Sequence, residues 1–182
     1  FDNIIIVGGM GNAMLKNTGN NIGKSVCDDG YKDLVEEILK KSKAHNCKIY
    51  YPLDVVVSKE LNGIGTIKEV NEVNNDEMIL DIGPKTILSI KKIIDESNTV
   101  LWNGPAGYFE NSNFANGTKK ILEIIAHKKS KDKIYVVAGG GETVAVINKF
   151  NKLDSFNFVS TAGGAFLEYL EGKELPGIKA LN

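Results

Sequence analysis

The feature that most constrains the fold is an apolar run that stops at three glycines and continues into a helical pattern. Residues 135–138 are rich in β-branched side chains, which predicts a buried strand. Glycines occupy positions 139–141, and Glu142 and Thr143 then open a segment with helical spacing. Such a turn lets an anion approach the backbone N–H groups, beside the helix N-terminus with its charge of about +0.5. The stretch predicts either a phosphate site or only a tight turn.

The same pattern of an apolar strand followed by a glycine turn recurs three times. Strands are predicted over residues 4–7, 99–102 and 156–159. The turns that follow them occupy residues 8–9, 103–105 and 160–164. In a doubly wound sheet the carboxyl ends of parallel strands lie at one edge, where ligands bind. Four such turns predict one extended cleft that suits an anion.

Amphipathic helices alternate with these strands. Apolar residues recur at helical spacing over residues 31–39, 87–94 and 114–125. Residues 58–78 form a polar excursion in which Asn62-Gly63 is a hairpin signal. We expect an α/β protein with a doubly wound, Rossmann-like, mainly parallel sheet, helices on both faces and a small surface hairpin.

Composition and motif spacing exclude several kinds of site. The 182 residues carry a formal net charge of -1, which argues against nucleic-acid binding. No apolar run approaches the roughly 18 residues of a membrane span. Cys27 and Cys47 lack a metal-ligand spacing and are expected to be reduced. Residues 19–25 are similar to a P-loop, but they have one residue too few between the glycines, so this motif is rejected. The dinucleotide-binding motif that would begin at Gly9 lacks its third glycine.

Several motifs occur in a fixed order along nearly the whole chain. They are Asp81-Ile82-Gly83-Pro84, Trp102-Asn103-Gly104-Pro105 with Phe109-Glu110, Gly139-Gly140-Gly141-Glu142-Thr143, Ser160-Thr161-Ala162-Gly163-Gly164-Ala165, and Leu167-Glu168 with Leu170-Glu171-Gly172-Lys173 and Leu175-Pro176-Gly177. Each is weak alone, but the ordered set resembles phosphoglycerate kinase. The resemblance is to the C-terminal half of that family. It implies that residues 1–182 are the nucleotide-binding domain of a two-domain kinase, without the N-terminal phosphoglycerate-binding domain.

The resemblance implies a reaction and its partners. Members of the family transfer a phosphoryl group reversibly between 1,3-bisphosphoglycerate and ADP, giving 3-phosphoglycerate and ATP in glycolysis, with Mg²⁺ as cofactor. By this resemblance the chain supplies the ADP/ATP site, is cytoplasmic and monomeric, and meets 3-phosphoglycerate only through the missing domain. From the net charge and the lack of a long apolar run we expect neither nucleic acid nor a membrane as a partner.

The resemblance also implies roles for single residues. The residues implied to surround the adenine and the nucleoside are Gly8, Gly9, Gly83, Asn103 and Pro105. Glu110 is implied to hold the ribose hydroxyls, and a carboxylate can accept from two neighbouring O–H groups. The residues implied to meet the phosphates are Gly140, Gly141, Glu142 and Thr143, with Glu142 as metal ligand. The residues implied to act in catalysis, facing the transferred group, are Gly141, Gly163 and Gly164.

Three residues depart from the family pattern. Glu142 stands where the family usually has aspartate, so its carboxylate reaches one methylene further toward a metal with strict octahedral geometry. Val7 and Ala162 stand where glycines are usual, and a Cβ costs energy wherever positive φ is needed. The family's Gly-Gly-Ala-Lys segment would come shortly before Phe1. We therefore expect a fragment that binds nucleotide weakly and has negligible turnover alone.

Two other functions remain open. The glycine-lined cleft also fits a divergent α/β transferase that uses a different nucleotide. A truncated or pseudoenzyme module, which binds nucleotide without turnover, fits the departures at Val7, Glu142 and Ala162.

Overall fold

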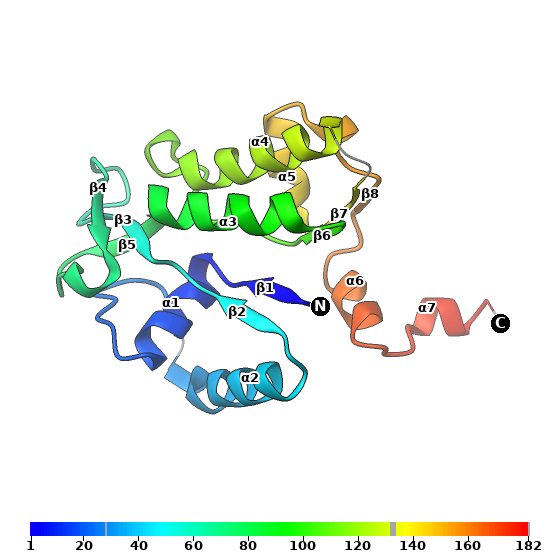
Figure 1. The fold of residues 1–182 in the computed structure, drawn as a ribbon, viewed down its shortest axis with the longest axis horizontal. Helices are drawn as coiled ribbons and strands as arrows, with labels where there is room; N and C mark the ends of the chain where they lie inside the picture. Colours follow the sequence, from blue (N-terminus) through cyan, green and yellow to red (C-terminus); the bar gives the residue numbers. More distant parts are fainter. Residues whose placement is uncertain (28, 132–133, 182) are drawn as a thin grey trace. The chain divides into compact units, whose positions relative to one another are not determined.

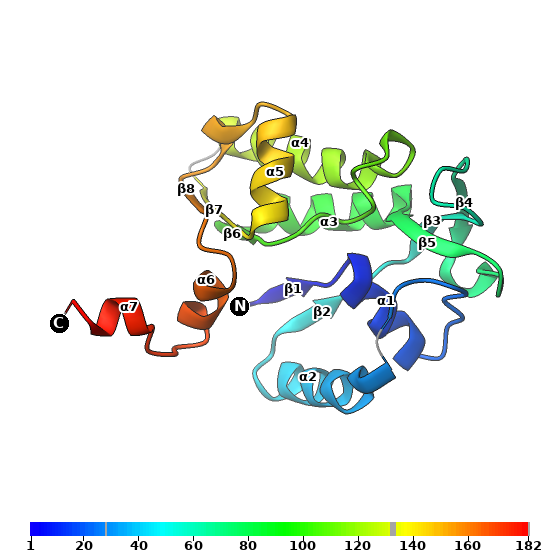
Figure 2. The same ribbon diagram turned by 180° about the vertical axis from the view of Figure 1, so that it is seen from behind.

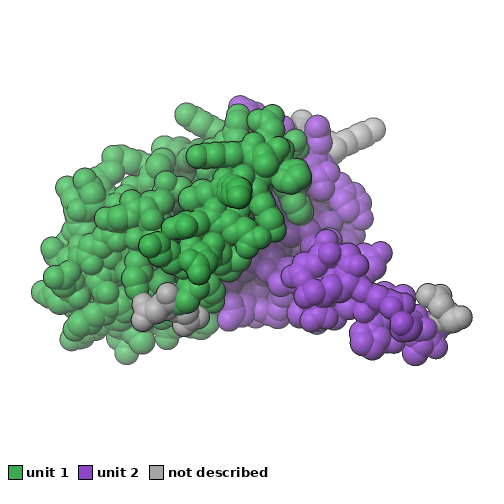
Figure 3. Space-filling view, turned by 90° about the horizontal axis from the view of Figure 1, so that it is seen from below, with its two compact units in different colours: residues 1–93, 106–121 green, residues 94–105, 122–182 purple. Residues whose placement is uncertain are grey.

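The computed structural model describes residues 1–27, 29–131 and 134–181, and it divides into two compact units (Figure 3). Unit 1 contains Phe1–Ile93 and Ala106–Ile121, and unit 2 contains Ile94–Pro105 and Leu122–Asn182. The boundaries between the units fall within α3 (Pro84–Glu96), after Pro105 and within α4 (Asn116–Lys131). Helix α3 begins at Pro84, whose fixed φ suits the first helical position.

Unit 1 starts with a parallel pair of short strands, β1 (Asn3–Ile5) and β2 (Lys48–Tyr50). The segment between them contains α1 (Gly8–Asn17), the 3₁₀ turn η1 (Asp29–Tyr31) and α2 (Lys32–Ala44). Both helices lie beside the strand pair in the two ribbon views (Figures 1 and 2). In α2, Val35 is buried and basic residues occupy the last turn, where they complement the helix dipole.

The second sheet of unit 1 is antiparallel, with strand order β4-β3-β5. Its strands are β3 (Asp54–Ser58), β4 (Thr66–Glu69) and β5 (Met78–Ile82), and the 3₁₀ turns η2 (Val70–Glu72) and η3 (Ser112–Phe114) belong to the same unit. The expected hairpin is confirmed, since Asn62-Gly63 lies in the connection between β3 and β4. Its first strand is the buried centre of the sheet, and the core beneath it contains Val55, Val57 and Leu15.

Unit 2 is built on a parallel sheet with strand order β6-β7-β8. The strands are β6 (Thr99–Trp102), β7 (Tyr135–Gly139) and β8 (Phe158–Ser160), and the later elements are α5 (Gly141–Lys149), η4 (Leu153–Ser155), α6 (Gly164–Leu170) and α7 (Pro176–Lys179). Helix α5 packs against β7 (Figure 2). The rings of Trp102 and Phe156 stack with centroids 6.1 Å apart.

The expected α/β class, with parallel strands and flanking helices, is confirmed. The parallel strands fall into two sheets in the described residues, because β1 pairs with β2 while β6, β7 and β8 pair together. Among the helices of the described residues, none is both long and apolar enough to cross a membrane.

Candidate functional site

Three of the four glycine turns leave the β6–β7–β8 sheet at the same edge. The parallel register pairs Trp102 with Ala138 and Gly139 with Ser160, so the strands end level with one another. The expectation of a shared edge is therefore confirmed for three turns. The fourth turn follows β1, which belongs to a separate sheet in unit 1.

Gly140 is the N-cap of α5, and its conformation explains why a glycine stands there. Its φ is 92° and its ψ is 140°, a region that L side chains rarely adopt. A Cβ at this position would also lie 2.9 Å from Oδ1 of Asn103. The helix begins at Gly141 with no side-chain cap, so its first N–H groups keep no partner within the helix. The turn therefore places backbone donors beside the Asn103 side chain.

Thr143 ties this turn to the neighbouring one. It is fully buried, and its Oγ1 accepts a hydrogen bond from Gly104 N at 2.7 Å. Oδ1 of Asn103 is buried but finds no hydrogen-bond partner among the described residues. An unpaired buried acceptor costs about 1–3 kcal/mol, so a ligand that donates to it would recover that cost. Pro105 follows at the end of this turn, partly buried.

Glu142 is exposed on the first turn of α5, where the helix dipole favours a carboxylate. No group of three or more His, Cys, Asp or Glu side chains that could hold a metal occurs among the described residues. Mg²⁺ commonly uses one or two carboxylates together with phosphate oxygens and water. The single carboxylate of Glu142 therefore fits a metal that is bound jointly with a phosphate ligand.

Gly163 and Gly164 open α6 at the third turn of the same edge. Gly163 is the N-cap with φ 54°, and apart from neighbouring parts of its own chain segment no described atom lies within 4 Å of where a Cβ would stand on either glycine. Ala162 is not among the described residues with positive φ, and Val7 has an extended φ of -131°. A side chain at either position is therefore compatible with the backbone, despite the glycines usual in similar sequences.

The other predicted site residues lie in unit 1. Gly8 and Gly9 form the first turn of α1, where a turn before the helix was expected, and Gly8 has φ 62°. Gly83 is buried, and its Cα faces the carboxylate of Asp54. Glu110 is exposed, on a loop that follows the buried Phe109.

Asp54 has a structural role that the sequence analysis missed. Its Oδ1 accepts hydrogen bonds from the backbone N and the hydroxyl of Thr86, both at 2.8 Å, and its Oδ2 accepts from Lys85 N at 2.9 Å. These groups belong to the first turn of α3, so a strand carboxylate caps the helix. Gly83 leaves the space that this cap fills. A carboxylate within an otherwise apolar strand is the only sequence signal that pointed to such a role.

Asp81 is a second buried carboxylate that received no role from the sequence. It is 1% exposed, and it accepts hydrogen bonds from Ile82 N at 2.9 Å and from Gly117 N at 2.7 Å. Desolvation by burial raises the pKa of Asp81 to about 6, although these backbone donors favour the ionised form. It therefore joins β5 to the start of α4.

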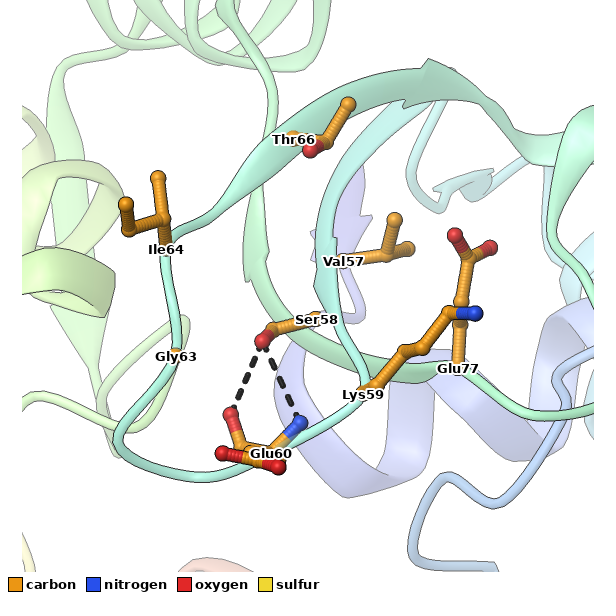
Figure 4. A pocket seen from close by; sticks show the side chains of 8 residues that line it. All are labelled: Val57, Ser58, Lys59, Glu60, Gly63, Ile64, Thr66 and Glu77. Atoms are coloured by element: carbon orange, nitrogen blue, oxygen red, sulfur yellow. Dashed lines mark hydrogen bonds between the residues drawn. The ribbon is translucent and has the colours of Figure 1, made fainter.

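A recess of about 270 Å³ lies on the β3–β4 hairpin and contains none of the predicted site residues (Figure 4). Its lining residues are Val57, Ser58, Lys59, Glu60, Gly63, Ile64, Thr66 and Glu77. Lys59 pairs with Asp76 at 2.7 Å and Glu77 pairs with Lys68 at 2.8 Å, so two of its charges are neutralised within the hairpin region.

Comparison with known proteins gives one consistent result. The family model described as phosphoglycerate kinase matches residues 1–173. The phosphoglycerate kinase of Xanthobacter autotrophicus is 44% identical over 182 residues, which is 99% of this chain and 46% of the relative. That of Francisella philomiragia is 46% identical over 180 residues, covering 98% of this chain and 45% of the relative.

Solved structures agree with the sequence comparison. The phosphoglycerate kinase of Coxiella burnetii superimposes with a TM-score of 0.91 at 40% identity, over 100% of this chain and 46% of that one. The enzyme from Pyrococcus horikoshii gives 0.82 at 28% identity, over 99% of this chain and 45% of that one. The chain thus spans about half the length of the curated relatives it matches.

Proposed function

The chain belongs to the phosphoglycerate kinase family, and on that premise we propose that it supplies the ADP/ATP site of a reversible phosphoryl transfer. In the proposed reaction a β-phosphate oxygen of ADP forms a P–O bond as the acyl P–O bond of 1,3-bisphosphoglycerate breaks. The products are ATP and the carboxylate of 3-phosphoglycerate. The observation that carries the proposal is the turn at Gly140, where the uncapped N-terminus of α5 stands beside Oδ1 of Asn103, which has no hydrogen-bond partner in the part of the chain that the structure describes.

The phosphates of the nucleotide are assigned to the backbone at this edge. Phosphoryl transfer depends mainly on positioning and on neutralising charge, and fixed N–H donors do both without reorganising. Gly140 and Gly141 contribute the N–H groups nearest to the turn. Thr143 contributes its backbone N–H, while its hydroxyl oxygen accepts from Gly104 N and so holds the two turns together. Gly163 and Gly164, whose surroundings are open, are assigned to the transferred phosphoryl group.

Mg²⁺ is assigned to Glu142 together with the phosphate oxygens of the nucleotide. When bound, it neutralises charge on those oxygens. The exposed position of Glu142 on the first turn of α5 supports this role, because the longer side chain is free to adjust its reach.

The nucleoside is assigned to the residues that the family pattern names. They are Gly8, Gly9, Gly83, Asn103, Pro105 and Glu110. The buried Oδ1 of Asn103 would accept from a ligand donor, and the carboxylate of Glu110 would accept from the ribose hydroxyls. The role of Gly83 is indirect: because it has no Cβ, the carboxylate of Asp54 can lie beside it and cap α3.

Calorimetric titration of the full chain with ADP, with and without Mg²⁺, tests the proposal. We expect weak binding that strengthens with Mg²⁺. Glu142→Gln should weaken Mg-ADP about tenfold, because a charge-assisted contact contributes about 1.5–3 kcal/mol, and should leave metal-free ADP nearly unchanged. Glu36→Gln, at an exposed position on α2, is the matched control. The absence of any ADP binding would refute the assignment.

A catalytic assay completes the test. Consumption of ATP that depends on 3-phosphoglycerate should be negligible for the 182-residue chain, since the relatives named for the reaction are about twice as long. Substantial turnover by a sample of verified mass 19.8 kDa would contradict this expectation.

A further inference from the structure

Glu110 lies on an exposed loop whose backbone is held on both sides of it. Two residues before it, Tyr108 N donates to Leu80 O in β5 at 2.7 Å. One residue after it, Nδ2 of Asn111 donates to Leu61 O at 2.8 Å. A carboxylate on an unrestrained loop loses conformational entropy when it binds a ligand, whereas a restrained one has lost it on folding. Glu110 is therefore presented from a fixed backbone.

The first set of restraints comes from β5 and α4. Ala106 N donates to Oγ1 of Thr118 at 3.0 Å, and both are buried. Gly107 packs so closely on Asp81 that a Cβ would lie 2.5 Å from its Oδ1. These contacts fix the loop before it reaches Glu110.

The second set comes from the β3–β4 connection, residues 59–65, which is about fifty positions earlier in the sequence. Asn111 bonds to Leu61 O, and Nδ2 of Asn113 donates to Gly63 O at 3.0 Å. Oδ1 of Asn111 also accepts from Asn113 N at 2.9 Å, so the two asparagines hold each other in place. Two side-chain amides thus attach the loop of Glu110 to the connection.

The connection is itself held in shape. Oγ of Ser58 donates to Glu60 O at 2.8 Å and accepts from Glu60 N at 3.3 Å (Figure 4). Gly63 approaches the same hydroxyl too closely to carry a Cβ. A Cβ on Gly65 would lie 3.2 Å from the ring of the fully buried Phe114. A rigid connection can act as a support, which a mobile one could not.

We propose that the β3–β4 connection is a brace for Glu110, and that Asn111 and Asn113 are positioning residues for recognition of the ribose hydroxyls of the nucleotide. The inference rests on the proposed function of Glu110. A carboxylate discriminates between hydroxylated and deoxygenated sugars only where its oxygens are held within hydrogen-bond distance of both O–H groups. The brace therefore acts on sugar selectivity and leaves the phosphate contacts alone.

The test compares the affinities of Mg-ADP and Mg-2′,3′-dideoxy-ADP, measured by calorimetry on the full chain. The wild type should prefer ADP by about tenfold to a hundredfold, the range for a hydrogen bond to a charged group. The double variant Asn111→Ala/Asn113→Ala should reduce this preference to about threefold or less while dideoxy-ADP binds as before. Asn113→Ala alone, at an exposed position, should show part of the same loss and preserves the cap made by Asn111.

Two control variants separate the possible failures. Glu110→Gln should reduce the preference as strongly as the double variant, and Asn71→Ala, at an exposed position of the same unit, should not change it. If Glu110→Gln leaves the preference intact, the ribose role of Glu110 is wrong and the inference falls with it. If Glu110→Gln abolishes the preference but the asparagine variants keep it, the brace alone is wrong. An equal weakening of both ligands would show a merely structural role and would also overturn the brace.

Discussion

The glycine turns at Gly140 and Gly83 look alike in the sequence and differ in what surrounds them. Both follow a strand and lead into a helix. At Gly140, within residues 1–27, 29–131 and 134–181, no side chain caps the helix N-terminus and no donor pairs with the nearby Oδ1 of Asn103. At Gly83 the corresponding space is filled by Asp54, which caps α3 with three hydrogen bonds. One turn is left open by the described side chains, and the other is closed by the carboxylate of Asp54.

The comparison teaches that a motif glycine before a helix can leave space for a ligand or for a carboxylate of the protein itself. A helix N-terminus needs partners for its first N–H groups in either case. Where the fold supplies the carboxylate, the turn contributes to stability. Where it does not, the turn is available to phosphate. Substitutions at the two glycines should therefore affect different measurements.

The largest expected effect is at Gly83. In Gly83→Ala the new Cβ would meet the buried carboxylate of Asp54, so the cap of α3 must break or the backbone must move. We expect a loss of about 3 kcal/mol or more in the free energy of unfolding, as for other disrupted buried networks. Urea denaturation measures it. A loss below about 1 kcal/mol would contradict the closed-turn description, since even modest overpacking costs that much.

The next effect is the pH dependence that Asp81 contributes. Its pKa is raised from 3.8 to about 6 in the folded protein, so between these values the folded state binds more protons than the unfolded state. Stability should therefore fall as pH rises through this window, by about 3 kcal/mol in total at 1.36 kcal/mol per pKa unit, and level off above it. Urea denaturation at pH 4.5 and 7 should show about 2 kcal/mol of this fall, because pH 4.5 already lies inside the window.

A matched variant isolates the contribution of Asp81. The side chain of Asp81→Asn cannot ionise, so the stability of this variant should fall less between the two pH values. The amide NH₂ faces one of the two backbone N–H groups that the carboxylate accepted from, which lowers stability at both pH values alike. The difference between the two proteins is the part due to Asp81. An identical pH dependence in both would rule out a raised pKa.

Much of the fold could be predicted because its signals are local. The strand over residues 99–102 has the expected bounds, since β-branched and aromatic residues there are followed directly by a turn. The signals for the start of α3 at Pro84 and for the turn at Gly140 also lie in adjacent residues of the sequence. The shared edge of three turns followed from the geometry of parallel strands alone.

The remaining features depend on contacts between distant positions. The sequence does not say that β1 pairs with β2, because partner choice is decided by tertiary packing. Asp54 meets its partners 31 and 32 residues later, and Asp81 meets Gly117 36 residues later. Gly8 and Gly9 belong to α1 although glycine is a poor helix former. Tertiary contacts override this low intrinsic helix propensity.

The smallest effect on stability, and the clearest on binding, is expected at Gly140. In Gly140→Ala a Cβ must occupy a backbone with φ 92° and stand 2.9 Å from Oδ1 of Asn103. The strain should cost about 1–2 kcal/mol of stability, less than at Gly83, since no buried carboxylate is displaced. The displaced turn should weaken Mg-ADP at least about tenfold, because removing a single charge-assisted hydrogen bond to phosphate is enough for that. Gly177→Ala is the control for adding a methyl group, because no described atom outside its own chain segment lies within 4 Å of the new Cβ.

Together, Gly140→Ala and Gly83→Ala test whether the two turns have different roles. If Gly140→Ala is as unstable as Gly83→Ala, both turns are structural and the weaker binding follows from unfolding. If it stays folded by circular dichroism and loses ADP, while urea denaturation shows the larger stability loss in Gly83→Ala, the open turn is the phosphate-binding one. Retention of full ADP affinity in a folded Gly140→Ala would contradict phosphate binding at this turn, because the new Cβ forces a change in the backbone that leads into α5.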